Sequence, residues 1–337
     1  QLYKEKDPLY GGFRGTPAYY IQDCFGRKGK KSIIAVLFAI SGLICWCGIS
    51  QVISNSVSSA FENAFHIPAL YTTIVLVILA AVIVLRKNAT VKVLDILVPI
   101  MATCYFVITL FIIFKNVTLL PSVFARIFEE AFGIRQAVAG GFGAILMNGV
   151  KRGLFSNEAG SGSAPCAAAA ADVGHPAKAG LLQAFGVFID TIVICTLTGL
   201  SIVLTGAWQV DGLEGVAVTT YAFQQGLPFP AEVSSFILML CLVFFAFTTI
   251  LGWDYYSERC LEYLTKGNQK AIKIFRWLYI FAVFIGPYMT VSAVWTIADI
   301  FNGLMALPNM IALFALNGVV VAETKKFFER HKNGEIQ

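Results

Sequence analysis

Polar side chains in the sequence gather inside or at the ends of long apolar segments. Gln51 and Asn55 close one such segment, and Thr248 and Thr249 lie near the end of another. Hydroxyl and carbonyl oxygens are the ligands that a hard monovalent cation prefers, whereas the free N–H groups of a helix N-terminus attract a carboxylate. The combination predicts a site for a monovalent cation and a small zwitterion.

The same kinds of residue also have purely structural interpretations. A threonine inside a membrane helix usually donates its hydroxyl hydrogen to a carbonyl of its own helix. Asp190, in a further apolar segment, would then cap a neighbouring helix or pair with a buried donor. Asp254 lies next to the expected end of its segment and would be a solvated end residue. The sequence alone leaves both interpretations open.

No set of residues in the sequence predicts catalysis or a resident metal. His66, His175 and His331 are far from one another and from paired cysteines, whereas a zinc site needs such ligands at short spacing. Most of the eight cysteines fall in apolar runs, where a thiol behaves as a small hydrophobe. No serine, histidine and acid converge as nucleophilic catalysis requires. We therefore expect no enzyme, no cofactor and no nucleic-acid partner.

A helix between Arg135 and Lys151 is too short to cross a bilayer. The fifteen residues between these charges extend about 22 Å, against roughly 30 Å of hydrocarbon. Gly140 and Gly141 lie near its start and favour an interruption, which a membrane tolerates only where the freed backbone lines a cavity or binds something polar. The alternative is an unbroken helix whose glycines let a neighbour approach closely.

The composition is that of an integral membrane protein. Hydrophobic residues make up 57% of the chain, mean hydropathy is +0.73 and charged residues make up 13%, against about 25% in soluble domains. No polar stretch is long enough to form a soluble domain. We expect one all-α membrane domain over residues 1–337, with a cytoplasmic loop (1–32), a helical bundle (33–322) and a cytoplasmic tail (323–337).

Apolar length predicts about eight transmembrane spans. Beside the short segment just described, the expected spans are 33–52, 67–85, 93–114, 180–204, 233–253, 277–289 and 291–322, the last bent at Pro308. Helices lying on the membrane surface are expected over 19–25 and 123–132. With both ends inside, 22 of the 25 Lys and Arg residues are cytoplasmic, as the excess of positive charge in cytoplasmic loops requires.

Several segments resemble one known family. GVKRGLFSNEAGSGSAP, followed by GHPAKAGLLQAFGVFIDTIVICT, is similar to the signature region of the alanine or glycine:cation symporters. FTTILGWDYYSERCLEYL and GLMALPNMIALFAL resemble later segments of that family, and GGFRGTPAYYI resembles its GGPMYYI loop, with Arg14 and Thr16 as departures. The resemblance covers essentially the whole chain.

The resemblance implies a LeuT-type fold, an inverted repeat of five plus five helices preceded by one extra helix. The eight expected spans then correspond to core helices three to ten. The extra helix and the first two core helices would be missing, so we expect an N-terminally truncated chain that cannot transport by itself.

The resemblance also assigns residues to the site. Gly141 and Phe142, with Gly140 beside them, match the unwound stretch that faces the substrate, and Thr249, Gly252 and Trp253 match the cation and substrate wall. Gln51 or Asn55 would approach the substrate, although CWCGISQVISNS departs from the family's GNMVQSNS pattern.

The expected function is symport of Na⁺, with H⁺ as the less favoured ion, and a small neutral amino acid, alanine or glycine. We expect a monomer in the plasma membrane, in contact with lipid. The alternatives are a transporter of the same fold for another amino acid or an organic cation, a passive channel, and a membrane-embedded hydrolase or transferase. Acidic rings, typical of cation channels, are absent from the spans.

Overall fold

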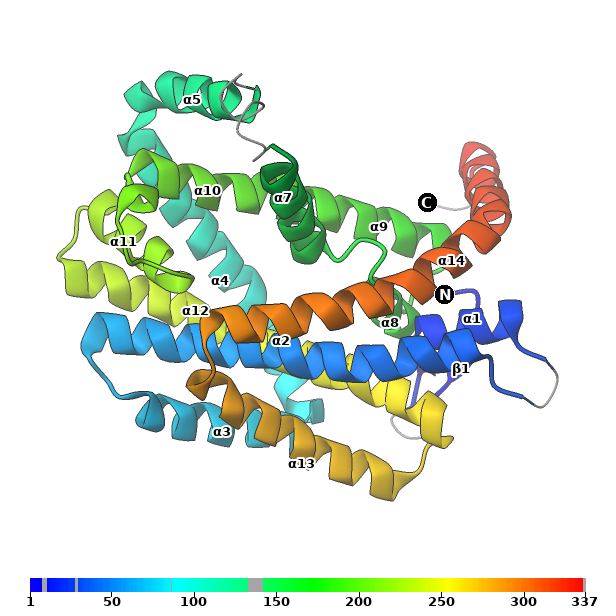
Figure 1. Ribbon diagram of the computed structural model, residues 1–337. Helices are drawn as coiled ribbons and strands as arrows, with labels where there is room; N and C mark the ends of the chain where they lie inside the picture. Colours follow the sequence, from blue (N-terminus) through cyan, green and yellow to red (C-terminus); the bar gives the residue numbers. More distant parts are fainter. Residues whose placement is uncertain (8–10, 28–29, 86, 133–141, 336–337) are drawn as a thin grey trace.

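The computed structural model describes residues 1–7, 11–27, 30–85, 87–132 and 142–335, and this part of the chain is almost entirely helical (Figure 1). The exceptions are two short antiparallel strands, β1 (Glu5–Lys6) and β2 (Phe13–Arg14). The helices are α1 (Pro17–Phe25), α2 (Ile33–Phe65), α3 (Ala69–Leu85), α4 (Lys87–Lys115), η1 (Val117–Leu119), α5 (Leu120–Phe132), α7 (Phe142–Asn157), α8 (Ala164–Ala170), α9 (Pro176–Phe188), the π-helix η2 (Ile189–Ile194), α10 (Cys195–Leu204), η3 (Ala207–Gln209), α11 (Val216–Gly226), α12 (Ala231–Thr265), α13 (Gln269–Ile285), η4 (Gly286–Tyr288) and α14 (Val291–Lys332).

Six stretches of the described helices are long and apolar enough to cross a membrane. They are α2, the second part of α4, the run from α9 through η2 to α10, α12, α13 with η4, and α14. This confirms the prediction of a helical integral membrane protein. Two of the eight expected spans are not among them: α3 is a shorter apolar helix, and the segment after Arg135 lies partly outside the described residues.

Helix α2 is the centre of the bundle and packs between α14 and α12 (Figure 1). Small residues make this possible, because helices in a membrane associate through close packing rather than through the hydrophobic effect. A Cβ at Gly48 would lie 3.2 Å from the side chain of Ile297 on α14. Around this contact Phe38, Trp46 and Met305 are almost completely buried, so the core is continuous across three helices.

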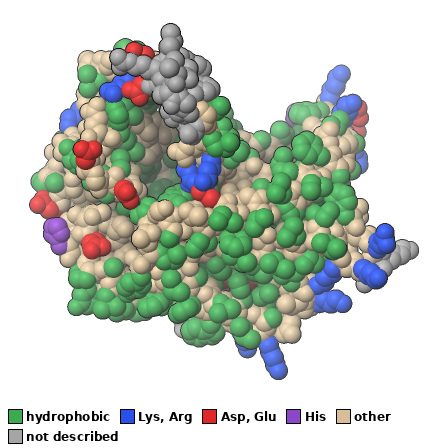
Figure 2. All heavy atoms as spheres, in the orientation of Figure 1, with side chains coloured by type: hydrophobic (Ala, Val, Ile, Leu, Met, Phe, Trp, Pro, Cys, Tyr) green, Lys and Arg blue, Asp and Glu red, His purple; other side chains and the backbone are tan. Residues whose placement is uncertain are grey.

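Apolar side chains also cover much of the outer surface (Figure 2). On α3, α9 and α13, large aliphatic and aromatic side chains such as Ile78, Leu182 and Trp277 are more than half exposed. A soluble protein rarely exposes so much contiguous apolar surface. The face in Figure 2 therefore agrees with contact between these helices and lipid.

The N-terminal segment packs on the end of α12 more tightly than a surface loop would. The Arg259 guanidinium, fully buried, pairs with Asp7 and, at 3.0 Å, with Glu262. Arg14 of β2 reaches the same Glu262 carboxylate at 3.2 Å. Burying these charges is tolerable because each is paired. As a result α12 continues as a helix to Thr265, well beyond the expected span end at 253.

Helix α13 ends where η4 packs closely against α2. Asn55 on α2 donates hydrogen bonds from Nδ2 to the carbonyl oxygens of Gly286 (3.0 Å) and Met289 (2.7 Å). These bonds satisfy backbone acceptors at the end of α13, where no further helical turn is available. A Cβ at Gly286 would lie 2.1 Å from Ser54 Oγ and 2.6 Å from the carbonyl oxygen of Gln51. Only glycine fits at position 286, because a larger side chain would collide with α2.

This contact gives a prediction for stability. We expect Gly286→Ala to lower the melting temperature in detergent by several degrees, because overpacking costs about 1–3 kcal/mol. Gly303→Ala on α14 is the matched control, since a Cβ there meets nothing within 4 Å and alanine favours a helix over glycine. Equal melting temperatures for the two variants would contradict the close approach of η4 to α2.

Candidate functional site

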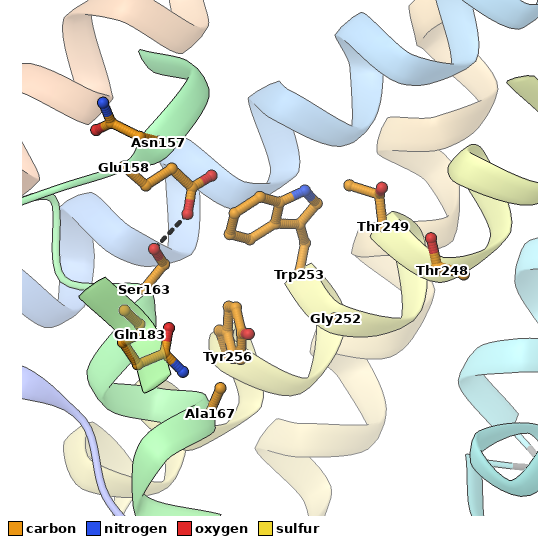
Figure 3. A pocket seen from close by; sticks show the side chains of 11 residues that line it. Asn157, Glu158, Ser163, Ala167, Gln183, Thr248, Thr249, Gly252, Trp253 and Tyr256 are labelled. Atoms are coloured by element: carbon orange, nitrogen blue, oxygen red, sulfur yellow. Dashed lines mark hydrogen bonds between the residues drawn. The ribbon is translucent and has the colours of Figure 1, made fainter. Parts of the chain in front are cut away.

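A cavity of about 390 Å³ lies between α12 and the opposite segments of α7, α8 and α9 (Figure 3). This volume is within the range of roughly 300–1,000 Å³ typical of small-molecule sites. Its lining residues are Asn157, Glu158, Ser163, Ala164, Ala167, Gln183, Thr248, Thr249, Gly252, Trp253 and Tyr256. One wall of the cavity therefore contains all four α12 residues that the sequence predicted as cation or substrate ligands: Thr248, Thr249, Gly252 and Trp253.

The two threonines of this wall use their hydrogens within their own helix. Thr248 and Thr249 each donate from Oγ1 to the carbonyl oxygen of Phe245, at 2.9 and 2.7 Å. Because the hydroxyl hydrogen is engaged, each Oγ1 can act toward the cavity only as an acceptor. A cation requires acceptor oxygens, so the structural hydrogen bond and cation binding are compatible. Gly252, one turn after Thr248, keeps the wall open: a Cβ there would meet nothing within 4 Å.

Aromatic rings make up the rest of the α12 wall. Trp253, only 9% exposed, stacks on Trp46 of α2 with ring centroids 6.3 Å apart and planes 15° apart. Tyr256 meets Trp253 edge to face, at 5.5 Å and 76°, and also contacts Trp46. Such pairs stabilise one another beyond the area they bury. The two rings that line the cavity therefore form a rigid corner.

The opposite wall is the α7–α8 turn, residues 158–163. Glu158 has a positive φ of 53°, which is uncommon for a residue other than glycine and persists only where the surroundings enforce it. Two contacts enforce it here: Asn309 of α14 donates to the carbonyl of Gly160 at 2.8 Å, and Gly162 packs on Phe38 so closely that a Cβ would lie 2.6 Å from its ring. The turn is thereby anchored to α14 and α2.

Glu158 is the one carboxylate among the residues that line the cavity. It lies outside the six candidate spans, and Figure 3 shows its side chain directed toward Trp253, with Ser163 donating a hydrogen bond to Oε2. Burial raises the pKa of Glu158 to about 7, the Ser163 hydrogen bond opposes this shift, and the charge of Asp190 adds to it. At neutral pH both forms of the carboxyl group are therefore populated.

The structure separates two of the other predicted site residues, Gln51 and Asn55, from this cavity. Asn55 lines a second cavity, of about 320 Å³, together with Glu214 and Trp295, and its amide is engaged by the end of α13. Gln51 lies one turn earlier on α2 and lines neither of these two cavities. Gly140 and Gly141 are outside the described residues, and of Phe142 only its place at the start of α7 is described.

The two intramembrane aspartates have different surroundings. Asp190 is in the π-helix η2 and accepts a hydrogen bond from Ser156 of α7 at 2.7 Å. It therefore pairs with a donor, but at an exposed position and not with the buried donor that one interpretation expected. Asp254 is fully buried in α12. The interpretation of Asp254 as a solvated end residue is therefore wrong, because the buried ion pairs beyond it let the helix continue.

Seven lining residues were not predicted from the sequence: Glu158, Ser163, Gln183 and Tyr256, together with Asn157, Ala164 and Ala167. A carboxylate in the turn after the short helix, within LFSNEAGSGSAP, was the available signal for the first two. Gln183 and Tyr256 have no such signal, because only the folded bundle places them on this cavity. Among the described residues no group of three or more His, Cys, Asp or Glu side chains forms a metal cluster.

Comparison with known proteins agrees with these features. A model of the sodium:alanine symporter family matches residues 1–337. The chain is 39% identical to a sodium/alanine symporter from Methanococcus maripaludis, over 96% of this chain and 71% of that protein. It is 40% identical to a probable sodium/glutamine symporter from Bacillus subtilis (99% and 68%) and 42% identical to an uncharacterized transporter from Haemophilus influenzae (96% and 70%). These matches confirm the prediction that the chain is a transporter and not an enzyme. The chain belongs to the sodium:alanine symporter family.

Proposed function

We propose that this protein couples inward movement of Na⁺ to uptake of a small neutral amino acid, alanine or glycine. The observation that carries the proposal is the cavity that brings Thr248 and Thr249 together with the Trp253 corner. Hydroxyl oxygens suit Na⁺, and rigid aromatic walls suit a small side chain. The family and a sodium/alanine symporter among the relatives support this choice.

Each part of the site has a separate proposed role in symport. Na⁺ binds to the acceptor oxygens of Thr248 and Thr249, and the amino acid lies beside it, where Trp253 limits the size of its side chain. The backbone of Gly140 and Gly141 and the first residue of α7, Phe142, are proposed to bind the carboxylate. One Na⁺ crossing 100 mV releases about 2.3 kcal/mol, which sustains a roughly 50-fold concentration ratio of the amino acid.

The proposed architecture is a LeuT-type bundle of about eight spans in the plasma membrane, active as a monomer. The described part of the chain supports both ends being cytoplasmic, because N and C lie at the same end of the bundle (Figure 1). The last turn of α14 at this end carries Arg330, His331 and Lys332, in keeping with positive charge on the cytoplasmic side.

Two alternatives remain distinguishable by experiment. The first alternative is a larger neutral substrate carried by the same fold, and the probable sodium/glutamine symporter among the relatives supports it. Inhibition of labelled alanine uptake by glutamine would measure whether glutamine binds. A passive channel would conduct Na⁺ without saturating with alanine, whereas a symporter shows alanine-stimulated Na⁺ flux that saturates.

The role of Thr249 can be tested by removing its hydroxyl without changing its shape. We expect Thr249→Val in the full-length protein to raise the Na⁺ concentration for half-maximal alanine uptake in proteoliposomes by about tenfold, because the cation loses one hydroxyl ligand. Thr249→Ser, which keeps the hydroxyl, should stay near the wild-type value.

The matched control is Thr324→Val. Thr324 makes the same hydrogen bond to its own helix, to the Val320 carbonyl at 2.8 Å, but lies on α14 and does not line the cavity. A Na⁺ dependence that is unchanged in Thr249→Val, or raised equally in Thr324→Val, would contradict cation binding at Thr249.

The role of Trp253 can be tested by making the corner smaller. Trp253→Phe should reduce the preference for alanine over glutamine, measured as the ratio of the two kcat/KM values, by about tenfold, since hydrophobic pockets discriminate by size on this scale. Trp46→Phe is the control, because Trp46 supports the stack but does not line the cavity. Equal changes in both variants would mean that the stack as a whole, and not the cavity wall, sets the selectivity.

A further inference from the structure

A further pocket, here called the α3 pocket, lies on the side of α12 that faces away from the candidate site. It has a volume of about 260 Å³ and lies between α2, α3 and α12, with Phe61, Leu76 and Val243 among its lining residues. On α12, Val243 and Gly252 are nine residues apart, which is about two and a half helical turns. The two residues therefore face opposite sides of α12, and the α3 pocket lies behind the wall of the candidate site.

The lining of the α3 pocket is almost entirely hydrocarbon. Among the described residues that line it, none carries a charge. Thr72 is buried, and its hydroxyl is engaged within the protein: Oγ1 donates to the Ala69 carbonyl at 2.9 Å and lies 2.9 Å from Ser58 Oγ. An apolar cavity of about 150 Å³ stays dry and admits benzene. The α3 pocket is larger, so its size and chemistry suit a hydrocarbon ligand.

The α3 pocket opens on the surface that contacts lipid. Val75 lines the pocket and is more than half exposed, as is Ile78 further along α3. The α2–α3 connection lies at the end of the bundle opposite to N and C (Figure 1), which the proposed topology places outside. Tyr71, 62% exposed, lines the pocket at this end, and tyrosines are enriched at the level of the lipid headgroups. The mouth of the pocket is therefore continuous with the outer leaflet.

We infer that the α3 pocket binds an acyl chain of a phospholipid from the outer leaflet. A helix of another protein is too wide, because one helical turn about 10 Å across and 5.4 Å long occupies roughly 400 Å³. A non-helical peptide would bring unpaired backbone groups into hydrocarbon, and the pocket has no free donor among its described lining residues to pair with them. A flexible hydrocarbon chain meets neither obstacle.

The bound chain packs against the back of α12. Val57, Leu76 and Ala246 form a small buried cluster beside the pocket, with Val243 packed against it. Ala246 adjoins Phe245, whose carbonyl accepts the hydrogen bonds of Thr248 and Thr249. Atoms that line a void lose their contacts on one side. The chain supplies these contacts, so it holds the segment of α12 that carries the candidate site against α2 and α3.

The first test locates the chain by photolabelling. The full-length protein is placed in liposomes of phosphatidylethanolamine and phosphatidylglycerol that contain a phosphatidylethanolamine with a diazirine in one acyl chain. After irradiation, mass spectrometry should find about tenfold more label on Phe61, Leu76 and Val243 than on Trp277 and Leu278. The last two are more than half exposed on α13 and report ordinary contact with lipid. Equal labelling of the two groups would overturn the inference.

The second test fills the pocket from α12. Val243→Phe should lower the labelling of Phe61 and Leu76 about tenfold, because the larger ring occupies the space of the chain. Leu240→Phe is the matched control, since Leu240 lies one turn earlier on α12, is exposed and does not line the pocket. Leu79→Phe fills the same pocket from α3 and replaces Val243→Phe if that variant does not fold. Labelling that is the same in filled and control variants contradicts binding in the pocket.

The third test separates a phospholipid from a free fatty acid, which carries the same kind of chain. In detergent, added phosphatidylethanolamine should raise the melting temperature of wild type and Leu240→Phe saturably, with no such rise in Val243→Phe. A pocket that is labelled by a diazirine fatty acid but not by the phospholipid would overturn the inference. None of these readouts measures transport, so a negative result leaves the proposed symport intact.

Discussion

Polar groups in a membrane must find their partners within the protein, and this constraint shapes the described part of the bundle. It explains why the hydroxyl groups of Thr248 and Thr249 donate hydrogen bonds to the Phe245 carbonyl. It also explains why the Asn55 amide donates a hydrogen bond to the Gly286 carbonyl at the end of α13. It also explains the paired charges around Arg259, which let α12 extend past the apolar core. The same constraint applies to the cavity, where the hydroxyl oxygens and the carboxylate can accept further interactions from a bound ligand.

The cavity depends on two rigid boundaries that belong to different parts of the chain. On one side, the Trp46 stack holds Trp253 against α2. On the other, Asn309 and Phe38 hold the α7–α8 turn. Both boundaries are anchored on the same α2 and α14 framework. Movement of α7 relative to α12 would therefore change the shape of the cavity between them.

The sequence predicts one of these boundaries well and the other poorly. Thr248, Thr249, Gly252 and Trp253 recur at the spacing of one helix face, so a single apolar segment is enough to place them together. Glu158 comes from a turn whose positive φ depends on Asn309, about 150 residues away in sequence, and no local pattern encodes that contact. For the same reason α12 is longer than its apolar run predicts: the ion pairs with Asp7 and Arg14 become visible only after folding.

The central claim is that transport uses the cavity between α12 and the α7–α8 turn. An experimental structure of the full chain with alanine and Na⁺ bound tests it most directly. We expect density for alanine beside the corner formed by Trp253 and Tyr256, with Na⁺ beside Thr248 and Thr249. Alanine bound instead in the second cavity, beside Asn55 and Glu214, with the first cavity filled only by water, would contradict it.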